Sequence, residues 1–77
     1  MEQETKIERQ HVLDAVIVRI MKARKTENHQ PLIQECMKQV TNFKPQPAMI
    51  KEAIERLIEK EYLKRDEEER SRYIYIP

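Results

Sequence analysis

Glycine is absent from this chain of 77 residues, which also lacks tryptophan and holds a single cysteine. Phosphate-binding loops, dinucleotide-binding fingerprints and nucleophile elbows all need glycine where the backbone meets a phosphate or turns sharply. The composition therefore excludes these enzyme classes. The lone Cys36 cannot form an internal disulfide, which is typical of a protein that works in a reducing compartment.

Long apolar runs and a strong net charge are missing as well. No run approaches the ~20 apolar residues of a membrane-spanning helix, and residues 1–5 are polar and acidic, unlike a secretory signal. The net charge of +1 gives no general attraction to nucleic acid or to anionic membranes. Since the chain is short and 39% of its residues are hydrophobic and 38% charged, we expect one small domain with a modest core. We also expect the isolated domain to be monomeric.

The pattern of apolar and turn-forming residues predicts three helices followed by two short strands. Residues 1–7 are expected to be a flexible lead-in and residues 8–77 the folded domain. The expected helices run from about Glu8 to Lys25, from a cap at Asn28 to about Thr41–Asn42, and from about Pro47 to Glu61; the strands are Tyr62–Arg65 and Arg72–Ile76. Residues 26–29 are expected to be a connection. This order, mainly α with a small β-hairpin, predicts a winged helix with a two-stranded wing.

Each predicted helix has an apolar stripe for the core. The stripes are Val12, Leu13, Val16, Ile17 and Ile20 in the first helix, Leu32, Ile33, Cys36, Met37 and Val40 in the second, and Ile50, Ala53, Ile54, Leu57 and Ile58 in the third. Three tyrosines, Tyr62, Tyr73 and Tyr75, are expected to pack the hairpin against the helices with their hydroxyls at the rim.

One lysine of the first predicted helix lies almost opposite its apolar stripe. At about 100° per residue, Lys22 is roughly 160° from the centre of the stripe, so its amine is expected to point outward. Ala15 and Val18 fall on the same side, and a valine on a solvated face favours a contact surface. By spacing alone, however, an outward lysine on a helix is most often a solvated charge without a role.

The segment from Ile17 to Lys25, IVRIMKARK, resembles the modification site of the cullins, the scaffold subunits of RING-type ubiquitin ligases. The resemblance extends from Glu8 to Ile76, and its order and spacing match the C-terminal winged-helix domain of that family. The other matching pieces are His29 and Leu32, Phe43-Lys44-Pro45, Ile50-Lys51, Ile54-Glu55 with Leu57-Ile58, Glu61-Tyr62-Leu63 with Arg65, and Tyr73-x-Tyr75. The chain departs from the family in its Ile76-Pro77 ending, where cullins usually have alanine, and in an acidic loop at residues 66–69.

The resemblance implies a regulatory domain that is not itself an enzyme and needs no cofactor or metal. Lys22 would accept a ubiquitin-like modifier through an isopeptide bond, the reaction called neddylation, and this would open a closed arrangement of cullin and RING subunit. The implied partners are a RING-box subunit, a conjugating enzyme, the modifier and the rest of the cullin scaffold, in the cytoplasm and nucleus. The flanking contact surface would consist of Ala15, Val18, Arg19, Arg24 and Lys25.

Two other lysines are secondary candidates for the same reaction. Lys25 lies about 60° further round the predicted helix than Lys22, and Lys6 precedes it in the lead-in. We expect both to be bystanders.

Two other classes of function stay open from the residues alone. A winged helix often binds DNA through its third helix, but residues 49–61 hold four glutamates against three basic residues, and the following loop is acidic, so nucleic-acid binding is not expected. A plain protein-interaction module is the other alternative. His11 and His29 have no second ligand at metal-binding spacing, and Glu67, Glu68 and Glu69 are best explained as a solvated charge run.

Overall fold

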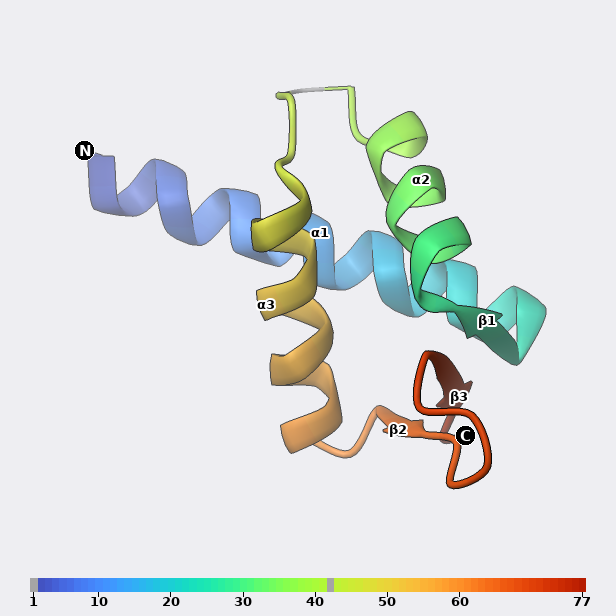
Figure 1. The fold of residues 1–77 in the computed structure, drawn as a ribbon. Coiled ribbons are helices and arrows are strands. Elements are labelled where there is room, and N and C mark those ends of the chain that lie inside the picture. Colours follow the sequence, from blue (N-terminus) through green and yellow to red (C-terminus); the bar gives the residue numbers. More distant parts are fainter. Residues whose placement is uncertain (1, 42) are drawn as a thin grey trace.

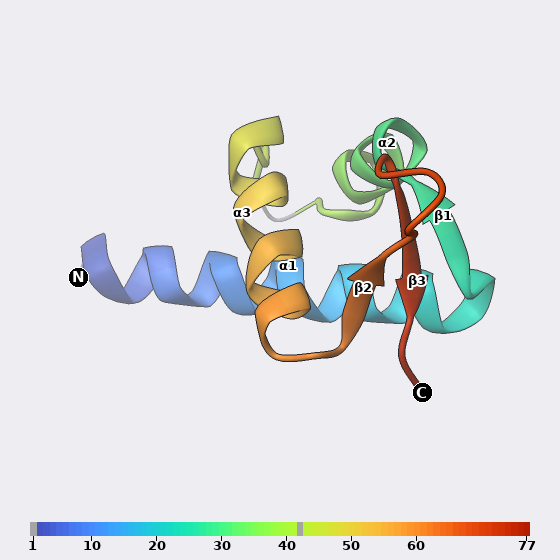
Figure 2. The same cartoon turned by 60° about the horizontal axis from the view of Figure 1, so that its bottom comes forward.

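The computed structural model describes residues 2–41 and 43–77, with side chains from residue 7 onward. Three helices and three short strands follow each other along the chain (Figures 1 and 2). Their bounds are α1 Glu2–Arg24, β1 Thr26–Asn28, α2 His29–Gln39, α3 Pro47–Glu59, β2 Leu63–Arg65 and β3 Arg72–Tyr75. Figure 2 shows α1 passing below α2 and behind α3 and the sheet, with its N-terminal part projecting beyond the rest of the domain.

The strands form an antiparallel sheet in the order β1-β3-β2. The central strand β3 pairs with both neighbours, since Tyr73 lies opposite Glu27 on one side and Arg65 on the other. The predicted winged helix and its two-stranded wing, formed by β2 and β3, are confirmed. The expectation of a connection at residues 26–29 is wrong, because β1 adds a third strand to the sheet. Residues 26–28 form a strand because β3 provides partners far away in the sequence, and three residues are too few for an alternating pattern to appear.

The first helix begins at Glu2 rather than near Glu8, so the expected start was six residues late. Residues 2–9 read EQETKIER, which includes glutamate, glutamine, lysine and arginine and no proline or glycine. These are good helix formers, and a polar stretch of this kind can continue a helix that is anchored further along the chain. The flexibility expected of residues 1–7 stays a prediction, and Met1 lies outside the described residues.

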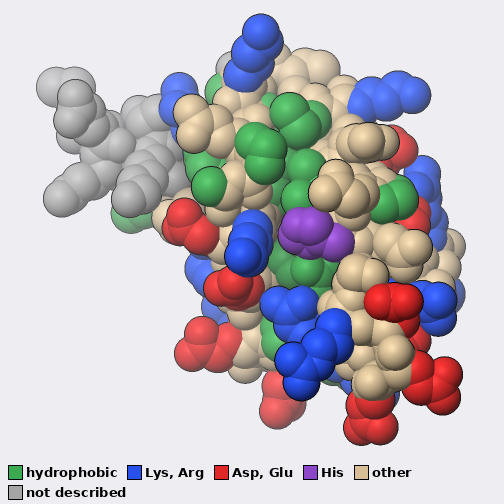
Figure 3. Space-filling view, viewed as in Figure 1, with side chains coloured by type: hydrophobic (Ala, Val, Ile, Leu, Met, Phe, Trp, Pro, Cys, Tyr) green, Lys and Arg blue, Asp and Glu red, His purple; other side chains and the backbone are tan. Residues whose placement is uncertain are grey.

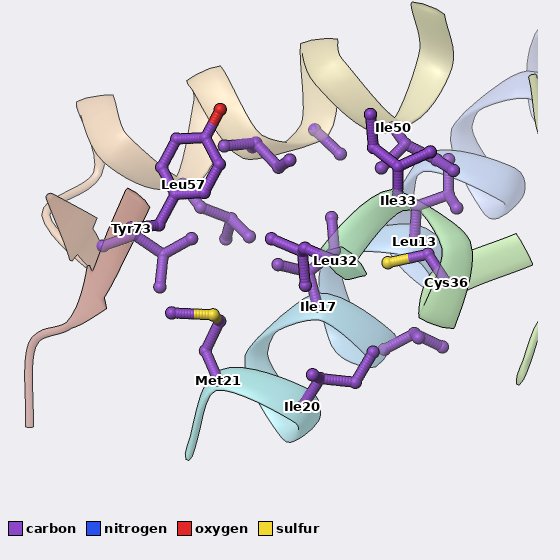
Figure 4. Close-up of a cluster of buried hydrophobic side chains, with 14 of the residues drawn as sticks. Leu13, Ile17, Ile20, Met21, Leu32, Ile33, Cys36, Ile50, Leu57 and Tyr73 are labelled. Carbon is purple, nitrogen blue, oxygen red and sulfur yellow. The ribbon is translucent and has the colours of Figure 1, made fainter. Parts of the chain in front are cut away.

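The core lies where the three helices and the sheet meet (Figure 4). Leu13, Ile17, Met21, Leu32, Cys36, Ile50 and Ile54 are essentially inaccessible, and Leu63 and Tyr73 close the core from the sheet. The predicted stripes are confirmed except at Val12 and Ile58, which are half-buried, and at Met37, which is exposed. A partly buried ion pair between Arg56 and Asp14, 2.9 Å long, also joins α3 to α1.

Two residues expected in the packed interior are exposed instead. Met37 is 44% exposed, because it lies at the edge of the α2 stripe defined by Leu32 and Cys36. Tyr62 is 49% exposed. Glu61 has a positive φ of 66° just after α3, and this turn directs Leu63 into the core while Tyr62 faces solvent.

The second helix begins where its cap was expected and ends earlier than expected. Asn28 occupies the N-cap position of α2, but its side chain makes no capping hydrogen bond. Instead, the backbone N–H of His29 donates to the Ser71 carbonyl oxygen at 2.6 Å, so a backbone group from the loop before β3 satisfies the helix start. The helix ends at Gln39, and the predicted end near Asn42 lies partly outside the described residues.

Candidate functional site

Lys22 lies in the last turn of α1, on the side that faces away from the core. The two preceding residues are buried, Ile20 with 4% of its surface exposed and Met21 with none, whereas Lys22 and Ala23 are exposed. The outward position of Lys22 therefore agrees with the helical geometry. The amine projects from a helix end that is anchored by its neighbours.

Arg24 is held by two carboxylates, although it is exposed. Its guanidinium donates to Glu27 in β1 at 2.6 Å and to Glu35 in α2 at 3.1 Å. The hydrogen bond to Glu27 is the main reason that the pKa of Arg24 is raised. The pKa of the Glu35 carboxyl is lowered, first by a hydrogen bond from Gln39 and then by the charge of Arg24. Arg24 thus joins the end of α1 to both β1 and α2.

Arg19 continues these contacts one turn earlier. Its guanidinium donates to the side-chain oxygen of Gln39 at 3.0 Å, and the Gln39 amide nitrogen donates to Glu35 at 3.0 Å. We call the five residues Arg19, Gln39, Glu35, Arg24 and Glu27 the polar chain. The polar chain lies along the end of α1 that carries Lys22. Its contacts fix the positions of Arg19 and Arg24, which precede and follow this lysine.

Lys25 departs from its predicted helical position. The helix ends at Arg24, and Lys25 has a positive φ of 73°, although its backbone N–H still donates to the Met21 carbonyl oxygen at 2.6 Å. The chain therefore turns away from the helix axis at Lys25, one residue before the predicted helix would have ended. The Lys25 carbonyl oxygen accepts a hydrogen bond from the backbone N–H of Tyr75 at 2.8 Å. Its Nζ atom lies 5.6 Å from the centroid of the Tyr75 ring. Within residues 7–41 and 43–77, the Lys22 side chain makes no hydrogen bond, ion pair or cation–π contact.

The two small apolar residues beside Lys22 differ in exposure. Ala15 is exposed as expected, but Val18 is half-buried and packs against the core. The expectation that Val18 lies on a solvated face is therefore only partly right. Lys6, the other secondary candidate, lies outside the described side chains.

A shallow hollow of about 500 Å³ lies between the start of α2, α3 and the hairpin. Its basic lining residues are His29, Lys51 and Arg65. The Nδ1 atom of His29 is 2.8 Å from the Tyr73 hydroxyl, a hydrogen bond that ties α2 to the central strand. Figure 3 shows acidic and basic side chains intermixed over this face, so it does not form one continuous basic surface.

Metal and nucleophile chemistry find no support in the part of the chain that the structure describes. It contains no cluster of three or more histidine, cysteine or acidic side chains that could hold a metal ion. Burial raises the pKa of the Cys36 thiol to about 12, which makes it a packed core residue rather than a nucleophile. None of the described helices is long and apolar enough to cross a membrane.

Comparisons with known proteins identify the family of this chain. A family model described as "Cullin protein neddylation domain" matches residues 8–69. The chain belongs to the cullin family. This cullin domain is 49% identical over 70 residues to Cullin-3 of Dictyostelium discoideum, covering 90% of this chain. It is 47% identical over 76 residues to Cullin-4 of Caenorhabditis elegans, covering 99% of this chain. The match spans 9% of the length of each of these two relatives.

A solved structure shows the same fold for a cullin domain. It is described as "A Dual E3 Mechanism for Rub1 Ligation to Cdc53: Dcn1(P)-Cdc53(WHB)". The TM-score is 0.92 at 42% sequence identity, and the match covers 99% of this chain and 88% of that one. The winged-helix assignment and the place of this chain among cullin neddylation domains therefore rest on both sequence and structure.

Sequence reasoning missed the residues that hold the arginines next to Lys22. Arg24 and Glu27 are three residues apart, a spacing that suggests an ion pair, and this signal could have been found. The contact between Arg19 and Gln39 joins residues 20 apart in the sequence, and no local pattern predicts it. Glu35 takes part only because α2 packs along α1.

Proposed function

We propose that this cullin domain is the modification-accepting part of a RING-type ubiquitin ligase scaffold and that Lys22 is the acceptor. The observation that carries the proposal is the contrast at the end of α1. Arg19 and Arg24 are bound in the polar chain and Lys25 lies over a tyrosine ring, whereas Lys22 is exposed and makes no such contact with the described residues. The Lys22 segment also matches the cullin motif, and the solved relative is described in connection with Rub1 ligation.

In this reaction the domain supplies only the position of the lysine amine. The neutral lysine amine attacks the carbonyl carbon of a thioester that joins the modifier's C-terminus to a cysteine of the conjugating enzyme. The new N–C bond forms, the C–S bond breaks, and the cysteine leaves as a thiolate while a base on the conjugating enzyme takes the amine proton. Lysine amines are ordinarily protonated at neutral pH, so the conjugating enzyme has to assist proton removal.

The proposal includes a regulatory role for the attached modifier. A RING-box subunit on the neighbouring part of the scaffold brings the conjugating enzyme to Lys22. A bulky modifier at this position favours an open arrangement of cullin and RING subunit if that arrangement accommodates it better, because a ligand shifts an equilibrium only through differential affinity. The exposed Ala15 and the rim of Val18 lie beside Lys22 and would take part in the contacts that change. The scaffold would work in the cytoplasm and nucleus.

The experiment is a reconstituted modification assay on a cullin scaffold that carries this domain. It combines activating enzyme, conjugating enzyme, RING subunit and modifier, and reads intact mass and the modified lysine. We expect a single addition at Lys22 that Lys22→Arg abolishes and that Lys38→Arg, a change at an exposed lysine of α2, leaves intact. Addition spread over several lysines alike, or none at all, would refute the proposal.

Nucleic-acid binding is the alternative that the surface disfavours. A helix that enters the major groove is expected to be basic because it lies next to closely spaced phosphates. Here α3 exposes Glu52, Glu55 and Glu59, and the face in Figure 3 mixes both signs of charge. We infer that the winged helix serves as a protein scaffold and not as a DNA reader.

A further inference from the structure

Two lysines, Lys22 and Lys25, lie three residues apart in one exposed basic segment, yet their surroundings differ. We propose that Lys25 is a second potential acceptor that the Tyr75 ring masks, so that Tyr75 biases the modification toward Lys22; this proposal rests on the proposed function. Tyr75 is then a selectivity residue: it takes no part in the reaction, and it acts by holding the competing amine. Three features of the structure lead to this assignment.

The first feature is the backbone at Lys25. A φ of 73° is uncommon for a residue other than glycine, and this chain contains no glycine. The conformation is held by the hydrogen bond from the Tyr75 N–H to the Lys25 carbonyl oxygen and by the pairing of Thr26 with Ile74 in the next register position. Lys25 therefore leaves the helical path of Lys22 and turns toward the end of β3.

The second feature is the ring itself. The Lys25 Nζ atom lies 5.6 Å from the centroid of the Tyr75 ring, within the ~6 Å range of a cation–π contact. Tyr75 is half-buried, packs against the core and lies opposite Leu63 in the sheet. The ring is therefore packed into the domain, whereas Lys25 is exposed.

The third feature is that the Lys25 amine cannot contact the Tyr75 ring and react with the thioester at the same time. The electron-rich face of the ring attracts the ammonium form of lysine, whereas attack on the thioester carbonyl requires the neutral amine at the enzyme's cysteine. Lys25 must therefore leave Tyr75 before its nitrogen can form the N–C bond and release the thiolate. An exposed cation–π contact of this kind shifts such an equilibrium about two- to fivefold, and the turned backbone adds to this bias toward Lys22.

The modification assay on the scaffold tests the masking of Lys25 by the Tyr75 ring with matched variants. Tyr75→Phe keeps the ring and Tyr75→Leu removes it, while both keep an apolar residue in β3. At limited reaction times we expect wild type and Tyr75→Phe to take one modifier, mainly at Lys22, with a slow second addition at Lys25. We expect Tyr75→Leu to add a second one at Lys25, about two- to fivefold faster than wild type does, and Lys25→Arg in the same chain to abolish it. Equal modification of Lys25 in all variants would overturn the proposal.

Chemical labelling of the 77-residue chain separates this proposal from the proposed function, since it needs no modification enzymes. A limiting amount of an amine-acetylating reagent is added, and the ratio of labelling at Lys25 to labelling at Lys22 is read by peptide mass spectrometry. We expect the ratio to rise in the order Tyr75→Trp, wild type and Tyr75→Phe together, and Tyr75→Leu, because tryptophan offers the strongest cation–π face.

The two tests fail in different ways. An unmodified Lys22 in the wild-type scaffold would reject the proposed function, while the labelling order would still decide whether the ring masks Lys25. If the modifier is added normally at Lys22 and the labelling ratio is the same for every residue at position 75, only the masking of Lys25 is rejected. If thermal unfolding shows that Tyr75→Leu does not fold, the comparison of Tyr75→Trp with wild type decides, and no decrease in Lys25 labelling would reject the mask.

Discussion

Truncation of Met21 tests whether the core really anchors the helix end that presents Lys22. Met21 immediately precedes Lys22 and is completely buried, and Figure 4 shows its side chain reaching from α1 into the core on the side where Tyr73 lies. Replacing a buried methionine with alanine costs about 2–5 kcal/mol, through lost burial and the cavity that remains. A domain of 77 residues is stable by only about 4–12 kcal/mol at the usual ~0.05–0.15 kcal/mol per residue.

The measurement is urea unfolding of the 77-residue chain, followed by circular dichroism. With a slope of about 1 kcal/mol per molar urea, typical of the smallest domains, Met21→Ala is expected to lower the unfolding midpoint by about 2 M or more. Met37→Ala is the matched control, because Met37 is 44% exposed on α2. We expect it to change stability by less than about 0.5 kcal/mol. Equal shifts for the two variants would refute the anchoring of the Lys22 helix by Met21.

Two further predictions concern the sheet. The pKa of Asp66 is lowered, mainly by the Glu68 backbone N–H and in smaller part by the Glu69 N–H and by Arg72. The stability that the ionised Asp66 carboxylate contributes is therefore complete above its ordinary pKa of 3.8. It is lost as the pH falls through the lower pKa that Asp66 has in the folded domain. Asp66→Asn should lower the melting temperature at pH 7 and converge with wild type in acid, and a constant difference at all pH values would contradict this. Tyr73→Phe removes the hydroxyl that is hydrogen-bonded to His29 and should lower the free energy of unfolding in urea by about 0.5–1.5 kcal/mol. Tyr62→Phe, at an exposed position, should leave this free energy almost unchanged. Equal effects of the two variants would contradict the role of the Tyr73 hydroxyl.

Apolar periodicity predicted most of the fold because three helices bury clear stripes. Ile54 and Leu57 of α3, for example, recur at the spacing of one helix face, and this local signal is independent of the partner on which the face packs. The change to an alternating pattern near Tyr73 likewise predicted the hairpin. The outward position of Lys22 followed from the same helical geometry.

The remaining features depend on contacts between distant parts of the chain. The strand at residues 26–28 exists because β3 lies beside it. Three residues are too few for an alternating apolar pattern that would predict a strand. The turn at Lys25 could not be read from a chain without glycine, because the usual marker of a positive φ is missing. The polar chain depends on how α2 lies along α1, which only the packed domain shows.

The place of β3 in the middle of the sheet has a consequence for the timing of folding. Residues 72–75 are the last strand of the domain to leave the ribosome, yet they pair with β1, which leaves it before α2 and α3 have been made. Synthesis proceeds at about 5–20 residues per second, so β1 and the turn at Lys25 remain without their partners for a few seconds in each new chain. During this interval Tyr75 has not yet reached Lys25, and the two lysines at the end of α1 differ less than they do in the finished domain. Under the proposed masking, a new copy of this domain acquires its bias toward Lys22 only when β3 is in place.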